Sequence, residues 1–161
     1  MIKGLHHNAY RCRDSEETRC FYEDFLGLPL ASTLEIGETK SGRKTETLHT
    51  FYQLDDGSFL AFFEAPDMVF EFKAQHDFEL HIALEVERPV LDAMFAKGRT
   101  SAVETRGISA HGFIDSIYFR DPNGYVIELT CKHEGHDAAM DPAHNGARSK
   151  LDAWQKSKAA R

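Results

Sequence analysis

The sequence lacks the features that mark several large classes of protein. Only three of its 161 residues are cysteine, an odd number with no metal-binding spacing, so we expect a reducing environment. No apolar run approaches the roughly 18 residues that a transmembrane helix requires. The first seven residues contain no apolar secretory segment. We therefore expect a cytoplasmic protein that has no membrane partner.

An excess of basic charge is also absent. Nineteen Lys and Arg residues against 26 Asp and Glu residues give a net charge of −7. This balance predicts no nucleic-acid partner, because a phosphate backbone is bound by basic surfaces. The chain has no glycine-rich phosphate-binding loop, nucleophile elbow or HExxH motif. What it does contain is 42 % hydrophobic residues, enough for a globular core, and nine histidines.

The first half of the chain, residues 3–66, predicts one strand, one helix and three further strands. Alternating apolar and polar residues favour a strand over 5–12. Asp14, with Glu17 three residues later, is typical of a helix N-cap, and Gly27 of the helix end. Strand patterns then cover 30–36, 44–54 and 59–64, the last two joined by a turn ending at Gly57.

The second half, residues 78–132, repeats that order. A strand over 80–86 precedes a helix that we expect to begin near Pro89 and to end at Gly98. Strands are expected over 101–106, 113–119 and 125–130, with a turn at 121–124. The offsets match: His7 to His81 is 74 residues and Gly57 to Gly124 is 67. We predict an α+β fold of two tandem βαβββ modules in a single domain, residues 1–132.

Two segments lie outside this repeat. The linker 66–78 is apolar in its middle, so we expect it to be packed. The tail 133–161 begins as a polar loop and ends in a short helix over 147–160, with Leu151 and Trp154 one helical step apart. We expect that helix to dock on the body of the protein or on a second subunit.

Three residues stand out as candidate metal ligands. His7 and His81 occupy corresponding positions on the first strand of each module, and Glu128 lies on the last strand of the second module. A carboxylate among apolar neighbours is costly to bury unless a positive group meets it. Two imidazoles and one carboxylate form the facial triad that holds a divalent metal and leaves positions open for substrate.

The motifs around these residues resemble the vicinal-oxygen-chelate superfamily, which includes glyoxalase I, bleomycin- and fosfomycin-resistance proteins and extradiol ring-cleavage dioxygenases. The resemblance covers about residues 3–132. It rests on three stretches: Gly4-Leu5-His6-His7, Phe21–Leu28 and Asp121–Glu128. It implies that the sheets curve into a cup, that His7, His81 and Glu128 converge on a divalent metal there, and that the protein is a homodimer.

The branch of the superfamily depends on a fourth ligand. Glyoxalase-like members supply a Glu or Gln on the last strand of module one. Counting four residues from Gly57, as Glu128 is four from Gly124, leads to Ala61, which cannot ligate a metal. Glu64 lies further along the same strand and is expected to face away. A shell of three ligands favours oxygen chemistry or bidentate substrate binding.

A second pattern resembles the extradiol dioxygenases. His111 is followed by Tyr118, then by Asp-Pro-Asn-Gly and Glu128, at the spacing of that family. The resemblance implies that His111 and Tyr118 hydrogen-bond the substrate or bound oxygen. One departure is the absence of the family's acid/base histidine, expected near Ser58; His49 and His76 are the nearest histidines.

These observations leave three functions open. The first is an extradiol-type dioxygenase that binds Fe(II) or Mn(II) and a catechol-like or other bidentate oxygen substrate. The second is a glyoxalase-like lyase or isomerase, in which Ni(II) or Zn(II) polarises a carbonyl group. The third is a metal-free protein that binds small molecules, although the complete set of three candidate ligands argues against it.

Overall fold

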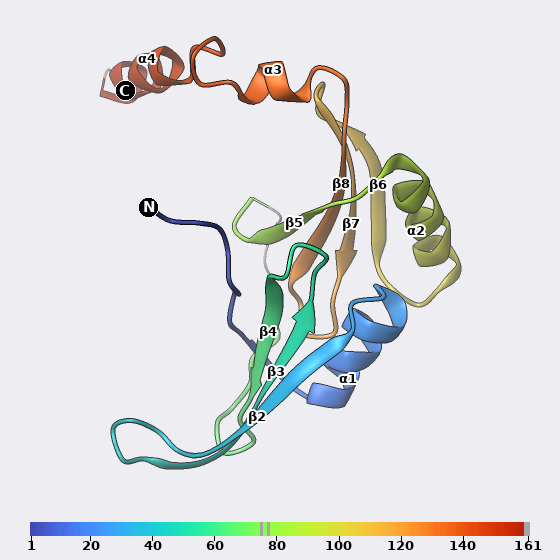
Figure 1. Ribbon diagram of the computed structural model, residues 1–161, viewed down its shortest axis with the longest axis vertical. Coiled ribbons are helices and arrows are strands. Elements are labelled where there is room, and N and C mark those ends of the chain that lie inside the picture. Colours follow the sequence, from blue (N-terminus) through green and yellow to red (C-terminus); the bar gives the residue numbers. More distant parts are fainter. Residues whose placement is uncertain (75, 77, 160–161) are drawn as a thin grey trace.

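The computed structural model describes residues 1–74, 76 and 78–159. Two four-stranded sheets follow one another along the chain, each with the middle strands antiparallel and one edge strand parallel (Figure 1). The first sheet has the order β1 (Tyr10–Cys12), β4 (Phe59–Glu64), β3 (Lys44–Gln53), β2 (Leu30–Glu38). The second has the order β5 (His81–Glu85), β8 (Val126–Lys132), β7 (Ile114–Arg120), β6 (Thr105–Ala110). The prediction of two tandem βαβββ modules is confirmed.

The helix of module one begins where the sequence indicates. The Asp14 side chain accepts a hydrogen bond from the Glu17 backbone N–H, at 2.8 Å, and so caps α1 (Ser15–Arg19). The helix continues as a π-helical segment, η1 (Cys20–Phe25), and the chain turns at Gly27, whose φ is +85°. A positive φ there is readily available only to glycine, so both predicted ends of this helix are confirmed.

The helix of module two corrects one prediction. α2 spans Arg88–Thr100, so Gly98 lies inside it and not at its end. A Cβ at Gly98 would come within 2.4 Å of Thr105 Oγ1 and 2.6 Å of Phe119 Cε1. The glycine is therefore needed for close packing of α2 on the sheet. The strand expected over 101–106 also begins later, at Thr105, because the chain needs residues 101–104 to turn out of the helix.

The main core lies between the sheets and the helices of their own modules. α1 and α2 cover the same side of the molecule (Figure 1). Apolar side chains from the strands and helices form one buried cluster, and its largest fully buried members are Tyr22, Tyr52, Phe62, Phe119, Leu60 and Leu91. Burial of this apolar surface is the main stabilising contribution to the fold. The opposite faces of the two sheets carry most of the histidines discussed below.

A buried polar network joins the two modules. The carboxylate of Asp121, 3 % exposed, accepts hydrogen bonds from the Tyr22 hydroxyl at 3.0 Å and from the backbone N–H groups of Asn123 and Tyr125. The Asn123 side chain accepts from the Arg13 N–H at 2.8 Å and donates to Thr18. The turn between β7 and β8 is thus fixed to the helix of module one, which sets the relative position of the two sheets.

The linker and tail are more exposed than the sequence suggested. Val69 and Phe78 are 91 % and 94 % exposed, so the prediction of a packed linker is wrong for these side chains within this chain. The tail leaves β8 through a short helix, α3 (His136–Met140), and ends in α4 (Ala147–Ala159), which extends away from the body (Figure 1). Among the described residues, no helix is both long and apolar enough to cross a membrane.

Candidate functional site

His81 and Glu128 meet on the open face of the second sheet. β5 and β8 are parallel neighbours, with Ala83 opposite Glu128 and His81 opposite Val126, so both functional side chains point to the same face. His81 Nε2 lies 3.1 Å from Glu128 Oε2. The Glu128 side chain is only 6 % exposed and the His81 side chain 39 %, so the imidazole covers a buried carboxylate. A carboxylate in that position requires a positive group beside it.

Tyr118 and His111 extend this site across the sheet. Tyr118 is the β7 residue directly opposite Glu128, and its hydroxyl lies 3.5 Å from Glu128 Oε1. The Nε2 atom of His111, which follows β6, lies 3.0 Å from the same hydroxyl. One continuous chain of contacts therefore runs from His111 through Tyr118 to Glu128 and His81. The structure brings together four of the five residues that the sequence singled out.

A cavity of about 740 Å³ opens above these four side chains. Arg106 of β6 lies on its wall, opposite Tyr118 in the strand register, with the guanidinium carbon 5.4 Å from the centroid of the Tyr118 ring. Sequence reasoning missed this arginine, which it placed at the end of the strand expected over 101–106, whereas β6, the second strand of the module, begins at Thr105. An arginine beside two hydrogen-bonding groups suits the recognition of an anionic, oxygen-bearing ligand.

His7 lies elsewhere in the molecule. It forms an isolated parallel bridge with Phe59, just before β1, and its ring contacts those of His49 and Phe51. Within the described part of one chain, no three His, Cys, Asp or Glu side chains lie close enough together to hold a metal. A single chain therefore does not bring His7 to the His81–Glu128 pair.

The open face of module one carries a different set of groups from that of module two. In the strand register, the position equivalent to Glu128 is Ala61, because His7 is opposite Phe59 as His81 is opposite Val126. The neighbouring His49 is 6 % exposed; its ring stacks on Phe63 at 3.7 Å and its Nδ1 lies 2.9 Å from the Phe62 carbonyl oxygen. Module one therefore presents histidine and aromatic rings where module two presents acids and hydroxyls.

Charged groups at the far end of the second sheet are mutually paired. The Asp115 carboxylate lies 3.2 Å from His133 Nε2 and 2.7 Å from the Arg88 guanidinium. The hydrogen bond from His133 holds the pKa of Asp115 below its usual value, and Arg88 acts in the same direction. This carboxylate is thus an ionised partner of basic groups and stands apart from the Glu128 contacts.

The chemistry of the donor set fits a divalent metal. An imidazole nitrogen and a carboxylate oxygen already converge within 3.1 Å, and these are donor types that Mn(II), Fe(II), Zn(II) and Ni(II) accept. A cation would also neutralise the buried Glu128. His81 and Glu128 could hold a metal with two ligands from this chain, and a third nitrogen donor would complete a facial triad.

Comparison with known proteins identifies relatives by sequence. Residues 4–129 match the family described as the Glyoxalase/Bleomycin resistance protein/Dioxygenase superfamily. The metallothiol transferase FosB of Shouchella clausii (strain KSM-K16) is 29 % identical to this chain over 140 residues, which cover 80 % of each protein. The tail beyond residue 129 lies outside the family match.

Solved structures show the same fold at lower identity. A glyoxylase/bleomycin resistance protein/dioxygenase domain from Frankia sp. EAN1pec aligns with a TM-score of 0.66 at 17 % identity, over 83 % of this chain and all of that one. The fosfomycin resistance protein FosX of Listeria monocytogenes, complexed with Mn(II) and sulfate, aligns with a TM-score of 0.62 at 19 % identity, over 86 % of this chain and 99 % of that one. These likenesses concern the fold alone.

Proposed function

We propose, from the premise that the chain belongs to the Glyoxalase/Bleomycin resistance protein/Dioxygenase superfamily, that it is a divalent-metal enzyme acting on a small anionic, oxygen-bearing substrate. The observation that carries this proposal is the 3.1 Å approach of His81 to the buried Glu128 in the wall of a cavity. A buried carboxylate with an imidazole and open space beside it is typical of a catalytic metal site.

The third ligand in this proposal is His7 of a second copy of the chain. His7 is exposed at the open edge of module one, and its own chain does not bring it to the pair. In a two-fold dimer, module one of each copy can face module two of the other, which creates two identical sites. The exposed Val69 and Phe78 of the linker also suit burial in such an interface. We therefore propose a homodimer.

The reaction that we favour is metal-assisted addition of a nucleophile to a carbon of the substrate without consumption of O2: the bond from that carbon to an oxygen breaks as the new bond forms, and the released oxygen takes the nucleophile's proton. The metallothiol transferase FosB is similar over most of this chain, and the FosX structure contains Mn(II). For this chain we propose Mn(II) or a related divalent ion and a thiol as one candidate nucleophile. The bound metal supplies Lewis-acid polarisation of a substrate oxygen.

The residues of this chain have separate roles in that reaction. His81 and Glu128 hold the metal, and Arg106 binds the anionic group of the substrate. The Tyr118 hydroxyl is placed to donate a hydrogen bond to a substrate oxygen on which negative charge develops. His111, 3.0 Å from that hydroxyl, fixes its orientation. Because these side chains have different roles, substitution of each one should change a different measured property of the reaction.

A second candidate is the extradiol-type dioxygenase, with Fe(II) or Mn(II) and a catechol-like substrate. The contact between His111 and Tyr118 favours it, because the spacing of these residues resembles that family. The place expected for an acid/base histidine holds Ser58, whose hydroxyl donates to Asp56 at 2.6 Å. The third possibility, a lyase or isomerase with Ni(II) or Zn(II), is disfavoured because the position of the expected fourth ligand holds Ala61. A metal-free binding protein remains as the outcome if no metal binds.

The test begins with the protein purified without a histidine tag and analysed for metal. We expect about one divalent ion per chain, and no ion in a Glu128→Ala variant with native circular dichroism. The Mn(II) form is then supplied with small oxygen-bearing anions and a panel of thiols, and the Fe(II) form with catechols in an oxygen electrode. Thiol consumption without oxygen uptake supports transfer; oxygen uptake with catechols supports the dioxygenase. Absence of metal and of both reactions contradicts the proposal.

Mixing two inactive variants tests the shared site. In a dimer of His7→Ala with His81→Ala chains, one site loses two ligands and the other keeps all three. Random mixing after unfolding and refolding should restore about a quarter of the wild-type activity, because half of the dimers are mixed and each has one intact site. No recovery, although mixed dimers are detected by mass, would place His7 outside the site.

The cytoplasmic location stays a prediction. Three free cysteines, with Cys12 and Cys131 buried and Cys20 exposed, are its support.

A further inference from the structure

Helix α4 presents an apolar face that its own chain does not bury. Leu151 and Trp154 lie one turn apart on this helix and are 49 % and 56 % exposed. Met140 of α3 is also 51 % exposed. Figure 1 shows α4 at the far end of an extended tail, away from both sheets. Large apolar side chains on a projecting helix are typical of an element that packs on a partner.

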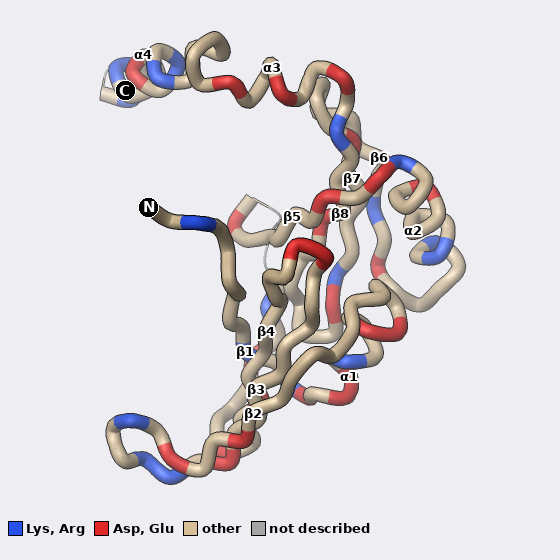
Figure 2. The backbone as a smooth tube through the Cα atoms, in the orientation of Figure 1, with Lys and Arg blue, Asp and Glu red and all other residues tan. Residues whose placement is uncertain are grey.

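The charge of this tail segment is opposite to that of the rest of the chain. Residues 147–161 contain five Lys and Arg residues and one Asp, a net charge of +4. The preceding residues 1–146 therefore contain the other 14 basic and 25 acidic residues, a net charge of −11. Figure 2 marks the Lys and Arg positions of α4 in blue along the backbone. We expect α4 to be attracted to an acidic surface with an apolar floor.

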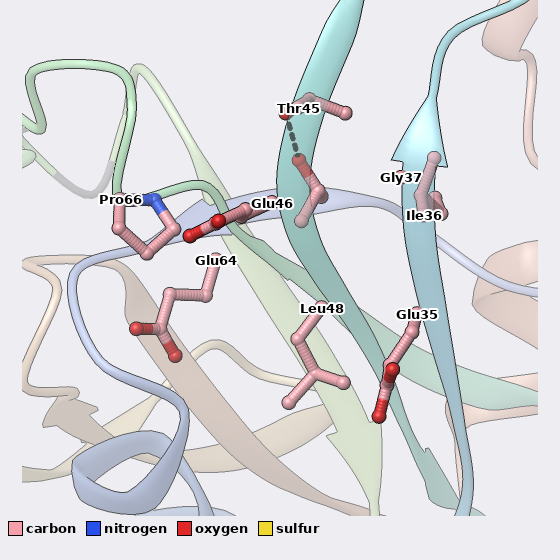
Figure 3. Close-up of a pocket in the computed structure, with 9 residues that line it drawn as sticks. Glu35, Ile36, Gly37, Thr45, Glu46, Leu48, Glu64 and Pro66 are labelled. Atoms are coloured by element: carbon pink, nitrogen blue, oxygen red, sulfur yellow. Dashed lines mark hydrogen bonds between the residues drawn. The ribbon is translucent and has the colours of Figure 1, made fainter.

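A groove on module one has this chemistry. It has a volume of about 450 Å³ and is lined by residues of β2 and β3 and of the chain that follows β4. Leu48 lies on its floor between Glu35 and Glu64, as the strand register requires (Figure 3). Glu46 adds a third carboxylate, and Pro66 adds further apolar surface. Three carboxylates around an apolar floor complement a helix with lysines around Leu151 and Trp154.

A buried hydroxyl next to this groove also lacks a partner. Thr50, on β3 two residues beyond Leu48, is 3 % exposed and lines an adjoining cavity that shares Leu48 and Glu64 with the groove. Within the described residues, its hydroxyl makes no hydrogen bond of good geometry, and its one polar neighbour in the electrostatics of the site is the Tyr52 hydroxyl. A buried hydroxyl is expected to be hydrogen-bonded. An incoming N–H donor, such as the indole of a tryptophan, is one group that could provide the partner.

The groove and α4 of one chain lie at opposite ends of the molecule (Figure 1). A chain therefore cannot fill its own groove in this conformation. The proposed dimer sets module one of each copy against module two of the other, and α4 continues from module two. The tail of one copy thereby starts near the module-one end of its partner and has to pass round that end, because the groove lies on the face of the sheet that also packs against α1. This step rests on the proposed dimer but not on its metal.

We propose that α4 of each copy docks in the Glu35–Glu46–Glu64 groove of a second copy, with Leu151 and Trp154 against Leu48 and the lysines beside the carboxylates. The tail is then a reciprocal clasp that holds the two chains together. The groove lies within residues 4–129, which match the family, whereas α4 lies outside that match.

Trp154 is the single tryptophan of the chain and reports directly on docking. Its fluorescence is measured in the full-length protein over a dilution series, alongside the mass from analytical ultracentrifugation. We expect emission at shorter wavelength in the dimer and at the wavelength of exposed tryptophan in the monomer. Glu35→Lys/Glu46→Lys should shift the emission of the concentrated protein to the exposed value. It should also raise the dimer dissociation constant at least tenfold, which is about 1.4 kcal/mol.

Exchanging the charges of the groove and of α4 distinguishes the loss of a direct contact from a loss of folding. Adding Lys150→Glu/Lys156→Glu to the groove variant should restore both the emission and the dimer. The control Glu87→Lys/Asp92→Lys makes the same charge change on α2, away from the groove, and should leave the emission unchanged. A mixture of Trp154→Phe chains that have an intact groove with groove-variant chains should regain the short-wavelength emission, because only the partner offers a groove.

Three results would overturn the proposal. Emission typical of exposed tryptophan at all concentrations would show that α4 does not dock. Short-wavelength emission that persists in the monomer would show docking within one chain. Emission that changes only when RNA or anionic lipid vesicles are added would assign α4 to another partner. Metal content is measured on the same samples, so loss of the metal site with an intact Trp154 signal distinguishes failure of the proposed function from failure of the clasp.

Discussion

The two modules share one topology but differ in what they place on equivalent positions of their open faces. Glu128 of module two corresponds to the buried Ala61 of module one, and Tyr118, opposite Glu128, corresponds to Phe51, opposite Ala61. Module two therefore presents an acid and a hydroxyl where module one presents a methyl group and a phenyl ring. Common to both are the histidines, His7 and His81, and the alanines two residues after them, Ala9 and Ala83.

This difference shows that two copies of one fold can serve different purposes. The backbone register supplies the same set of positions twice, while the side chains make one face polar and the other aromatic. A polar face with a buried carboxylate can hold a cation, and an aromatic face can exclude water from what binds opposite to it. The predictions below test this difference between the modules and the contacts that support it, in decreasing order of expected effect.

Removal of the carboxylate that distinguishes module two should have the largest effect. Glu128→Gln keeps the size of the side chain and removes its charge, so we expect metal affinity and activity to fall by at least about 100-fold. Isothermal titration with Mn(II) measures the affinity. Glu38→Gln, which changes an exposed carboxylate on β2 of module one outside the groove, is the control and should bind metal as the wild type does. Equal losses in both variants would remove the contrast between the modules.

The junction between the modules should show the next largest effect. Asp121→Asn replaces an acceptor-only group with one that also donates, so the Tyr22 hydroxyl or one of the N–H donors loses its buried partner. We expect the free energy of unfolding to fall by about 3 kcal/mol, measured by urea denaturation. Tyr22→Phe removes a single hydrogen bond and should cost about 1 kcal/mol. A near-neutral Asp121→Asn would show that the network is not what joins the modules.

Close packing of α2 on its sheet gives a smaller effect. Gly98→Ala places a methyl group 2.4 Å from Thr105 Oγ1 and 2.6 Å from Phe119 Cε1. Overpacking of this kind should destabilise the protein by about 2 kcal/mol, although alanine is the better helix former. Gly98→Ala combined with Thr105→Ala, which removes both the Oγ1 and the Cγ2 atoms that the new methyl group meets, should recover part of the loss. Stabilisation by Gly98→Ala alone would mean that the helix can move outward without cost.

The cap of the module-one helix gives an effect of about 1 kcal/mol. Asp14→Ala removes the acceptor of the Glu17 N–H bond, and Asp14→Asn, which keeps an acceptor oxygen, should lose less. Thermal unfolding followed by circular dichroism compares the two variants. A loss in Asp14→Asn as large as that in Asp14→Ala would indicate that the negative charge near the helix start matters more than the hydrogen bond.

The pH dependence of the same junction should be the smallest effect. Burial raises the pKa of Asp121, so the folded protein binds this proton more tightly than the unfolded chain. The contribution of Asp121 to stability therefore falls as pH rises from the usual aspartate range through the raised pKa, and it returns as pH falls. The difference in urea midpoint between wild type and Asp121→Asn should change in that window. A constant difference would contradict the raised pKa.

Local signals predicted most of this architecture. The Asp14 cap, the positive-φ glycines at 27, 57 and 124 and the alternation of apolar residues each depend on neighbours in sequence, so they could be interpreted before any tertiary contact was known. The boundaries of α2 and β6 could not. From sequence alone, a glycine that ends a helix cannot be distinguished from a glycine inside a helix that allows close packing on a strand. At Gly98 the contacts with Thr105 and Phe119 show that it is the second kind.

The candidate site also contains residues that local sequence patterns could place and residues that they could not. Glu128, Tyr118 and His111 follow from strand periodicity and a motif within one module, and they lie together. The position of His7 relative to His81 depends on how two sheets meet, which no local pattern encodes. The place of Arg106 in the site depends on its pairing with Tyr118 across β6 and β7. The apolar composition of the linker did not reveal that Val69 and Phe78 are exposed.

The equivalence of Ala61 and Glu128 has an evolutionary consequence. Alanine codons GCA and GCG become the glutamate codons GAA and GAG by one nucleotide change, so the missing acid is a single mutation away. The register places position 61 on the same face as His7, so in the proposed site a glutamate there would be the candidate fourth ligand, provided that the groups burying Ala61 make room for it. A lineage with this fold can therefore cross between three-ligand and four-ligand chemistry in one step, and Ala61→Glu recreates that step at the bench.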